Sequence, residues 1–192
     1  QAGGSIARPA VPSEAERPGR GELVYVAVGA NLGDRDATLS AVIERIEAEV
    51  EMTLLAASTV FETAPVGPEG QGAYLNAALA LRTALAPLAL LRRLQAIEAF
   101  LGRDRRREPV RWGPREVDLD LLFFGHRIID HPDLVVPHPR AHERAFVMTP
   151  LAELAPALLH PVLGQRVDEI AASLAEAGDV REWPSPPGWP LE

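Results

Sequence analysis

The sequence predicts an α+β fold in which helices pack on an antiparallel sheet. Two observations support this class. Segments rich in β-branched and apolar residues alternate with segments whose apolar residues recur at helical spacing, in the order strand, helix, strand, strand, helix, strand. Hydrophobic residues make up 47% of the 192 residues, which suits one domain with a real core. This β-α-β-β-α-β order is that of the ferredoxin-like split βαβ sheet, here with extra C-terminal helices.

The first half of that pattern lies before residue 72. An apolar run predicts a buried strand over residues 22–29. Residues 34–50 are expected to form a helix, with Asp34 or Asp36 near its N-cap. A second strand is expected over 53–61, and residues 63–72, with three glycines and two prolines, should form a rigid, irregular loop.

The second half begins with a third strand over residues 75–85. A helix is expected to open at Pro87 and to end at Gly102, because proline suits the first helical turn and glycine the residue after the last. A loop over 103–115 then leads to a fourth strand over 117–124, and Gly125 turns the chain toward residues 127–129. Two shorter helices are expected around 141–154 and 167–177.

The domain organisation is predicted to be a core between two tails. Residues 1–22 are rich in glycine, proline, alanine and charge without periodicity, which is typical of a disordered segment. The folded domain is expected over residues 23–178. Residues 179–192, rich in proline and tryptophan, are expected to be a loosely held tail.

Composition excludes several functions. A formal charge of −8 argues against a protein devoted to nucleic acid or to anionic membranes. There is no cysteine, so thiolate and disulfide chemistry are absent, and no apolar run approaches the roughly 20 residues of a membrane span. All 19 basic residues are arginine; without lysine there is no Walker A loop, and no Gly-x-Gly-x-x-Gly is present either.

A pair of aspartates on the fourth strand is the strongest candidate for a metal site. Asp118 and Asp120 alternate along the strand, so both carboxylates should lie on one face, with Cα atoms about 6.6 Å apart. Their repulsion would be relieved by Mg²⁺, which prefers carboxylate and phosphate oxygens. The alternative is a half-exposed strand whose acidic side simply faces water.

Arginines are concentrated just before these aspartates, at positions 103, 105, 106, 107, 111 and 115. Guanidinium groups bind phosphate oxygens bidentately, so this loop favours a triphosphate partner and could close over substrate. A solvated charge run or an RNA-binding patch are the alternatives. The strands lack the paired aromatic residues on which RNA bases stack, which argues against RNA.

Histidines and aromatic residues offer further candidate sites. Pro137 and Pro139 bracket His138, which argues against a zinc-binding helix there, and the remaining histidines (126, 131, 142 and 160) are expected at the surface. Trp112, Phe146 and Tyr74 could stack on a flat heterocycle, and Asn76 could bond to its edge. Tyr74 and Phe146 could equally be core residues.

Several motifs, in this order, resemble one family. Residues 28–34 (Val-Gly-Ala-Asn-Leu-Gly-Asp), 63–67 (Thr-Ala-Pro-Val-Gly), 74–76 (Tyr-Leu-Asn) and above all 111–120 (Arg-Trp-Gly-Pro-Arg-Glu-Val-Asp-Leu-Asp) resemble those of 6-hydroxymethyl-7,8-dihydropterin pyrophosphokinases. Residues 97–98, 102–103, 137–138 and 144–146 follow in the family's order. The resemblance covers about residues 23–175.

The resemblance implies a reaction and a set of site residues. The enzyme would transfer pyrophosphate from ATP to 6-hydroxymethyl-7,8-dihydropterin and release AMP, in the cytoplasm, with its product passing to dihydropteroate synthase. Two Mg²⁺ ions would be held by Asp118 and Asp120, and the catalytic set would be completed by Arg115, Arg103 and Arg105. The pterin would bind at Thr63, Ala64, Val66, Tyr74, Asn76, Trp112 and Phe146. ATP would contact Gln95, Glu98, Arg105, Arg111, Arg115, Leu121, His138 and Arg144.

Two points stay open from the sequence. Glu98 is either a plain solvent-exposed residue or, by the resemblance, a partner that orients an arginine such as Arg103. The function is either the pyrophosphokinase reaction, another Mg²⁺-dependent nucleotidyl or phosphoryl transfer, or RNA binding by a ferredoxin-like module.

Overall fold

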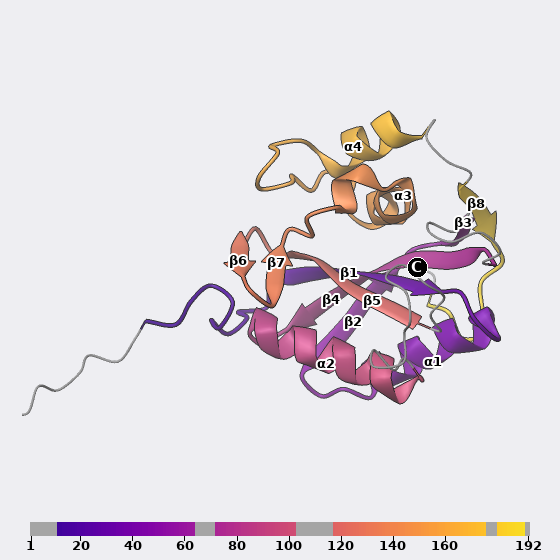
Figure 1. Cartoon of the computed structure of the whole chain (residues 1–192), viewed down its shortest axis with the longest axis horizontal. Coiled ribbons are helices and arrows are strands. Elements are labelled where there is room, and N and C mark those ends of the chain that lie inside the picture. Colours follow the sequence, from indigo (N-terminus) through magenta and orange to yellow (C-terminus); the bar gives the residue numbers. More distant parts are fainter. Residues whose placement is uncertain (1–10, 64–71, 103–116, 176–179, 191–192) are drawn as a thin grey trace, which may run out of the picture.

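The computed structural model describes residues 11–63, 72–102, 117–175 and 180–190. The strands of this part of the chain form a main antiparallel sheet, with helices on both of its faces, and a small second sheet (Figure 1). The elements are β1 (Leu23–Ala30), α1 (Arg35–Glu47), β2 (Met52–Ala57), β3 (Val60–Thr63), β4 (Tyr74–Thr83), α2 (Pro87–Phe100), β5 (Val117–Phe124), β6 (Ile129–His131), β7 (Leu134–Val136), the short 3-10 helix Ala141–Glu143, α3 (Ala145–Leu154), α4 (Val167–Leu174) and β8 (Val180–Trp183).

The main sheet has the strand order β5-β1-β4-β3-β8, and β2 pairs with β4 beside β3. Each of these strand pairs is antiparallel. β6 and β7 form a separate small hairpin, so the turn at Gly125 leads into a second sheet. The predicted class, a mixed fold of helices on an antiparallel sheet, is confirmed.

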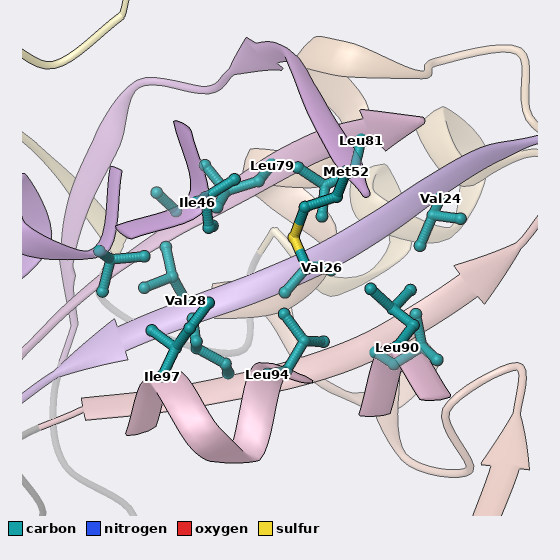
Figure 2. Packing of buried hydrophobic residues seen from close by; sticks show 14 of the residues in the cluster. Val24, Val26, Val28, Ile46, Met52, Leu79, Leu81, Leu90, Leu94 and Ile97 are labelled. Atoms are coloured by element: carbon teal, nitrogen blue, oxygen red, sulfur yellow. The ribbon is translucent and has the colours of Figure 1, made fainter. Parts of the chain in front are cut away.

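The helices divide between the two faces of the sheet. Helices α1 and α2 cover one face, and α3 and α4 lie over the other (Figure 1). Val24, Val26 and Val28 of β1 point toward the first face and pack with residues of α1 and α2 such as Ile46 and Leu94 (Figure 2). Residues between them, including Tyr25, belong to a second apolar cluster with α3. Burial of each such aliphatic side chain is worth about 1.5–3 kcal/mol, so this two-sided core stabilises the sheet that carries the site.

The start of α1 follows the sequence prediction. Asp34 is the N-cap, and its Oδ1 accepts a hydrogen bond of 3.0 Å from the Ala37 N–H. This bond satisfies one of the free N–H groups of the first turn.

Among the described residues, no helix combines the length and the apolar character needed to cross a membrane.

The second predicted strand is divided into β2 and β3 at Ser58 and Thr59. The Ser58 N–H donates to the Ala78 carbonyl, and the Ser58 hydroxyl accepts a bond of 2.8 Å from the Ala78 N–H. At this break between the strands, the Ser58 side chain therefore replaces a backbone carbonyl as the acceptor of an inter-strand hydrogen bond. Serine side chains often compete with the backbone for hydrogen bonds. The interruption at Ser58 also requires Ala78 of the neighbouring strand β4, so it could not be predicted from the local sequence.

The prediction of a disordered N-terminal tail over residues 1–22 is wrong for residues 11–22, the described part of that range. Ala15 is buried, and its carbonyl accepts a bond from the Leu88 N–H at the start of α2. Arg127 donates to the Arg17 and Pro18 carbonyls and pairs with Glu22 at 2.6 Å. The segment is held by contacts distant in sequence, which local composition does not reveal.

The prediction of a loosely held C-terminal tail is also wrong for residues 180–190. β8 pairs with β3 at the edge of the main sheet. Trp189 is buried, and its indole N–H donates to the Ser58 carbonyl at 2.8 Å. The proline-rich composition suggested a loose tail, whereas two tryptophans, 183 and 189, bind the segment to the domain.

Gly19 provides a test of the packed N-terminal segment. A Cβ atom at Gly19 would lie 2.4 Å from the Thr83 carbonyl oxygen and 2.9 Å from that of Leu85, both backbone atoms that cannot move aside cheaply. We expect Gly19→Ala to lower the free energy of unfolding by about 2–3 kcal/mol, in the range of overpacking. Urea denaturation measures this, with Gly72→Ala as the control because a Cβ there meets nothing within 4 Å. Equal stability of the two variants would contradict the packing of residues 11–22.

Candidate active site

Asp118 and Asp120 lie on the α3 side of the sheet. Their pairing partners on β1 are Gly29 and Ala27. Ala27 packs into the cluster formed with α3, and residues directly opposite in an antiparallel sheet share a face. Both aspartates are only partly buried. The alternation predicted from the sequence therefore places two carboxylates on one face of β5.

A row across three strands joins Asp118 to Asn76. Gly29 of β1 pairs with Asp118 on one side and with Asn76 of β4 on the other. A Cβ at Gly29 would lie 3.1 Å from the Asn76 Oδ1 and 3.9 Å from the Tyr74 ring. The residue between the carboxylate and the amide is thus one without a side chain. Sequence reasoning missed Gly29 as a site residue, although a glycine inside a strand can mark close approach by a ligand.

Asn76 is held by a neighbouring hydroxyl. Its Nδ2 donates to the Thr63 Oγ1 at 2.6 Å, and both side chains are buried. Thr63 pairs with Tyr74 across β3 and β4, so the two strands bring Thr63, Tyr74 and Asn76 together. Three of the residues predicted to bind the heterocycle are therefore neighbours.

His138 is fixed beside β5 by its backbone. Its N–H donates to the Leu122 carbonyl at 2.9 Å, and its Nδ1 accepts from the Arg140 N–H at 3.2 Å. Burial, reinforced by the Arg144 charge and opposed by Asp118, lowers the pKa of His138 to about 4. The ring is therefore neutral at pH 7. Because Nδ1 is an acceptor, the proton is assigned to Nε2, which is available as a donor.

Arg144 brings a positive charge to the same carboxylates. It precedes α3, and its guanidinium carbon lies 5.7 Å from the centre of the Phe146 ring. Burial lowers the pKa of Arg144, while the charges of Asp120 and Asp118 act in the opposite direction. Arginine keeps its charge even so. An acidic pair, a neutral histidine and an arginine thus lie close enough to interact electrostatically, beside the row at Gly29.

Glu98 is not a solvent-exposed residue. It is 1% exposed, and its Oε2 accepts a bond of 3.0 Å from the Leu119 N–H, between the two aspartates. Because β5 is an edge strand, this N–H faces away from β1, and a carboxylate on α2 satisfies it. Glu98 therefore holds the backbone that carries the acidic pair. The expected partner Arg103 lies outside the described residues.

The remaining predicted site residues divide into three groups. Leu121 is buried in the core on the α1 and α2 side, so its side chain faces away from the aspartates. Gln95 is half-buried on α2, and Phe146 is half-buried at the start of α3. Seven predicted residues lie outside the described part of the chain: Ala64, Val66, Arg103, Arg105, Arg111, Trp112 and Arg115.

His160 corrects the prediction that the other histidines lie at the surface. It is 4% exposed, and its ring packs edge-on against Phe123 and His142. Its Nδ1 accepts from the N–H groups of Val162 and Leu163, which fixes a tight turn. The fold has buried this histidine as a structural residue.

The donor set of this face fits Mg²⁺. Within the described ranges, no group of three or more His, Cys, Asp or Glu side chains is placed to hold a metal ion. Two carboxylates are what Mg²⁺ requires when the other ligands are water and substrate phosphates. Asp118 and Asp120 therefore suit a metal that arrives with a phosphorylated substrate.

The neutral His138 predicts a pH dependence of stability. Its pKa is lower in the folded protein, about 4, than the ordinary value of 6.5, so the unfolded chain binds more protons between these values. We expect the free energy of unfolding to fall as pH drops from 6.5 to 4, and the fall to be smaller in His138→Gln. Urea denaturation at pH 7, 5.5 and 4.5 measures it. An identical fall in both proteins would contradict the neutral, partly buried state of His138.

Together, the fold and the site define a class: an α+β protein whose carboxylate pair, histidine and arginine lie together at one face of an antiparallel sheet. The sequence model of the 7,8-dihydro-6-hydroxymethylpterin-pyrophosphokinase (HPPK) family matches residues 25–156. The chain belongs to this family, which confirms the resemblance seen in the sequence.

Individual relatives agree with this assignment. The chain is 40% identical over 162 residues to the 2-amino-4-hydroxy-6-hydroxymethyldihydropteridine pyrophosphokinase of Bacillus subtilis, covering 84% of this chain and 90% of the relative. Its identity to the enzyme of the same name from Pseudomonas aeruginosa is 45% over 152 residues, covering 79% and 91%.

A solved structure shows the same fold. The wild-type HPPK-DHPS protein of Plasmodium falciparum matches with a TM-score of 0.65 at 12% identity, over 82% of this chain. The chain spans 45% of the length of that protein. At this identity the likeness concerns the fold alone.

Proposed function

We propose that this protein transfers pyrophosphate from ATP to 6-hydroxymethyl-7,8-dihydropterin, forming the dihydropterin diphosphate and AMP in folate biosynthesis. Membership of the HPPK family and the names of its relatives support this reaction. The observation that supports particular residues is the row Asp118–Gly29–Asn76, in which a carboxylate and an amide lie on either side of a glycine; we propose that this amide binds the heterocycle.

The proposed reaction is a displacement at phosphorus. The hydroxymethyl oxygen of the pterin forms a bond to the β-phosphorus of ATP, and the bond from that phosphorus to the oxygen bridging the α-phosphorus breaks. AMP leaves with that oxygen, and the hydroxyl proton is released. The chain's contribution is chiefly positioning and electrostatic stabilisation, as in other phosphoryl transfers.

Each described site residue has a proposed role in this reaction. Asp118 and Asp120 would hold Mg²⁺, which would supply charge neutralisation of the phosphates. Arg144 would bind a phosphate oxygen by its guanidinium, and His138 would donate its Nε2–H without adding a charge. Thr63, Tyr74 and Asn76 would hold the pterin, with Asn76 bonding to its edge.

Residues outside the described ranges keep their proposed roles. Ala64, Val66 and Trp112 would complete the pterin site, and Arg103, Arg105, Arg111 and Arg115 would neutralise the transferring phosphates. Gln95 and Glu98 are proposed on the ATP side, and Leu121 can act there only through its backbone.

The finer fold assignment is part of this proposal. The order β5-β1-β4, with β2 and β3 side by side on β4, supports a ferredoxin-like split βαβ sheet whose second strand is interrupted. β8 and the helices α3 and α4 are additions to it. We propose that residues 23–178 form the catalytic unit and that residues 11–22 and 180–190 pack onto it.

The setting of the reaction is also proposed. A product diphosphate would pass to dihydropteroate synthase, and the joining of HPPK and DHPS in the name of a solved relative supports this link. Because the reaction consumes ATP, we propose that the protein works in the cytoplasm.

An assay of the nucleotide product tests the function. Purified protein is incubated with ATP, Mg²⁺ and hydroxymethyl-dihydropterin, and nucleotides are separated by chromatography. We expect AMP to form in equal amount with the pterin diphosphate. ADP in place of AMP would indicate a simple kinase, and unchanged ATP together with salt-sensitive RNA binding would support the RNA-binding alternative.

Gly29→Val tests whether the row Asp118–Gly29–Asn76 belongs to the pterin site. The added methyl groups would enter the space between Asn76 and Asp118, because even a Cβ there lies 3.1 Å from the Asn76 Oδ1. We expect KM for the pterin to rise at least about tenfold, corresponding to roughly 1.4 kcal/mol. KM for ATP in the same variant is the internal control. Unchanged pterin KM would remove Gly29 from the site.

A further inference from the structure

We propose that Arg35, held by Trp183 of the C-terminal strand, is a positioning residue that sets Thr63 and Tyr74 in place for the pterin. This inference rests on the proposed function. Arg35 and Trp183 lie outside the set of residues that would touch pterin, ATP or Mg²⁺. Trp183 also lies beyond the segment that the family model matches.

Arg35 joins two strands that carry pterin-side residues. Its Nη1 donates to the Glu62 Oε2 at 3.0 Å and to the Ala73 carbonyl at 2.7 Å. Glu62 immediately precedes Thr63 at the end of β3, and Ala73 immediately precedes Tyr74 at the start of β4. One guanidinium therefore fixes both strands at the point where Thr63 and Tyr74 pair.

The C-terminal strand holds this guanidinium in place. The Arg35 guanidinium carbon lies 4.9 Å from the centre of the Trp183 ring, a cation–π contact. The Trp183 indole N–H donates to the Asp36 Oδ1 at 3.1 Å, which ties the ring to the start of α1. Arg181 of the same strand pairs with the second oxygen of Glu62 at 2.7 Å. Trp183 and Arg181 thus contact the arginine and its acceptor from β8, the strand that lies beside β3 at the edge of the sheet (Figure 1).

The contacts act from the opposite face of the sheet. Glu62 pairs with Leu75, whose side chain belongs to the core beneath α1 and α2. Thr63 and Asn76 point to the other face, because successive residues of a strand alternate. Arg35 therefore does not reach the pterin-side groups but sets the strands from which they project, including the Thr63–Asn76 bond of 2.6 Å.

The contacts of Arg35 favour a role in positioning the pterin-side strands over a large contribution to folding stability. The Arg35 and Glu62 side chains are 21% and 14% exposed. The partly exposed ion pair with Glu62 contributes little to folding, and the bond to the Ala73 carbonyl and the cation–π contact add modest amounts, whereas binding residues must be held within about 0.5 Å of their working geometry. Loss of Arg35 should therefore affect pterin binding before it affects the fold.

Steady-state kinetics of Arg35→Met and Trp183→Leu test the inference. We expect KM for the pterin to rise about tenfold in Arg35→Met and about threefold in Trp183→Leu, with kcat and KM for ATP within about twofold of wild type. Arg35→Lys should recover part of the loss, because a lysine can still reach one acceptor. The double variant should resemble Arg35→Met alone, since Trp183 acts through the arginine.

Arg93→Met is the matched control. Arg93 on α2 pairs with Glu49 and Glu51 at 3.2 and 2.9 Å, so the variant also removes an arginine shared by two acceptors. Its kinetic constants should be unchanged. If pterin KM stays at the wild-type value in Arg35→Met, or if all constants fall together with the melting temperature, the positioning role is wrong. If wild type forms no AMP from ATP and the pterin, the proposed function itself fails, and this inference with it.

Discussion

Asp118→Asn and Asp120→Asn are each expected to lower kcat by about a thousandfold. The two carboxylates share one face of β5, and they are the described groups best suited to bind Mg²⁺ with substrate phosphates. An amide keeps the shape of the side chain but loses the charge that holds the metal. A loss of roughly 4 kcal/mol is in the range found when one preorganised group of a charge-stabilising site is removed.

Folding should not suffer from either substitution. The aspartates repel each other, so losing one charge leaves stability unchanged or slightly raised. Single-turnover kinetics with Mg²⁺ and thermal unfolding of the same samples measure the two effects. Asp130→Asn is the control, because Asp130 is an exposed aspartate on β6. Near-wild-type kcat in either site variant would show that the acidic pair is not the metal site.

Glu98→Leu is expected to lower the free energy of unfolding by about 2–3 kcal/mol and to reduce kcat as well. The substitution leaves the Leu119 N–H buried without its acceptor, and an unsatisfied buried donor costs an amount of this order. Leu119 lies between Asp118 and Asp120, so movement of its backbone displaces both carboxylates. Glu98→Gln keeps an oxygen for the same bond and should lose less of both.

Urea denaturation and steady-state kinetics of both Glu98 variants test this expectation. Glu44→Leu is the control, since it makes the same change at an exposed position on α1. If Glu98→Leu were as stable as that control, the carboxylate would not be supporting β5. If Glu98→Leu lost stability but kept full kcat, the support would be structural without positioning the aspartates.

Local sequence patterns predicted most of the helices and strands. The apolar spacing of residues 39–46 and the cap at Asp34 are local, so α1 was expected where it forms. The alternation of Asp118 and Asp120 likewise needs only the two-residue period of a strand to place both on one face. The ordered motifs added the family, which the comparisons confirm.

Local sequence patterns did not predict the packing of the segments near the two ends of the chain. Residues 11–22 and 180–190 carry the composition of loose segments, and they are ordered by contacts with residues far away in sequence. The bond from Trp189 to the Ser58 carbonyl spans 131 positions, and that from Arg127 to Pro18 spans 109. Composition describes what a segment can bury by itself, not what the rest of the domain offers it.

The class of fold, the family and the acidic pair could be predicted from the sequence, because each depends on periodicity or on residues close together in the chain. Three relations appear only in the folded protein: Gly29 lies between Asp118 and Asn76, Glu98 is buried against Leu119, and Arg35 is held by Trp183. These relations follow from strand register and from the packing of helices on the sheet. Register is set by pairing between distant segments, and a shift of one residue in a strand would turn its side chains to the other face of the sheet.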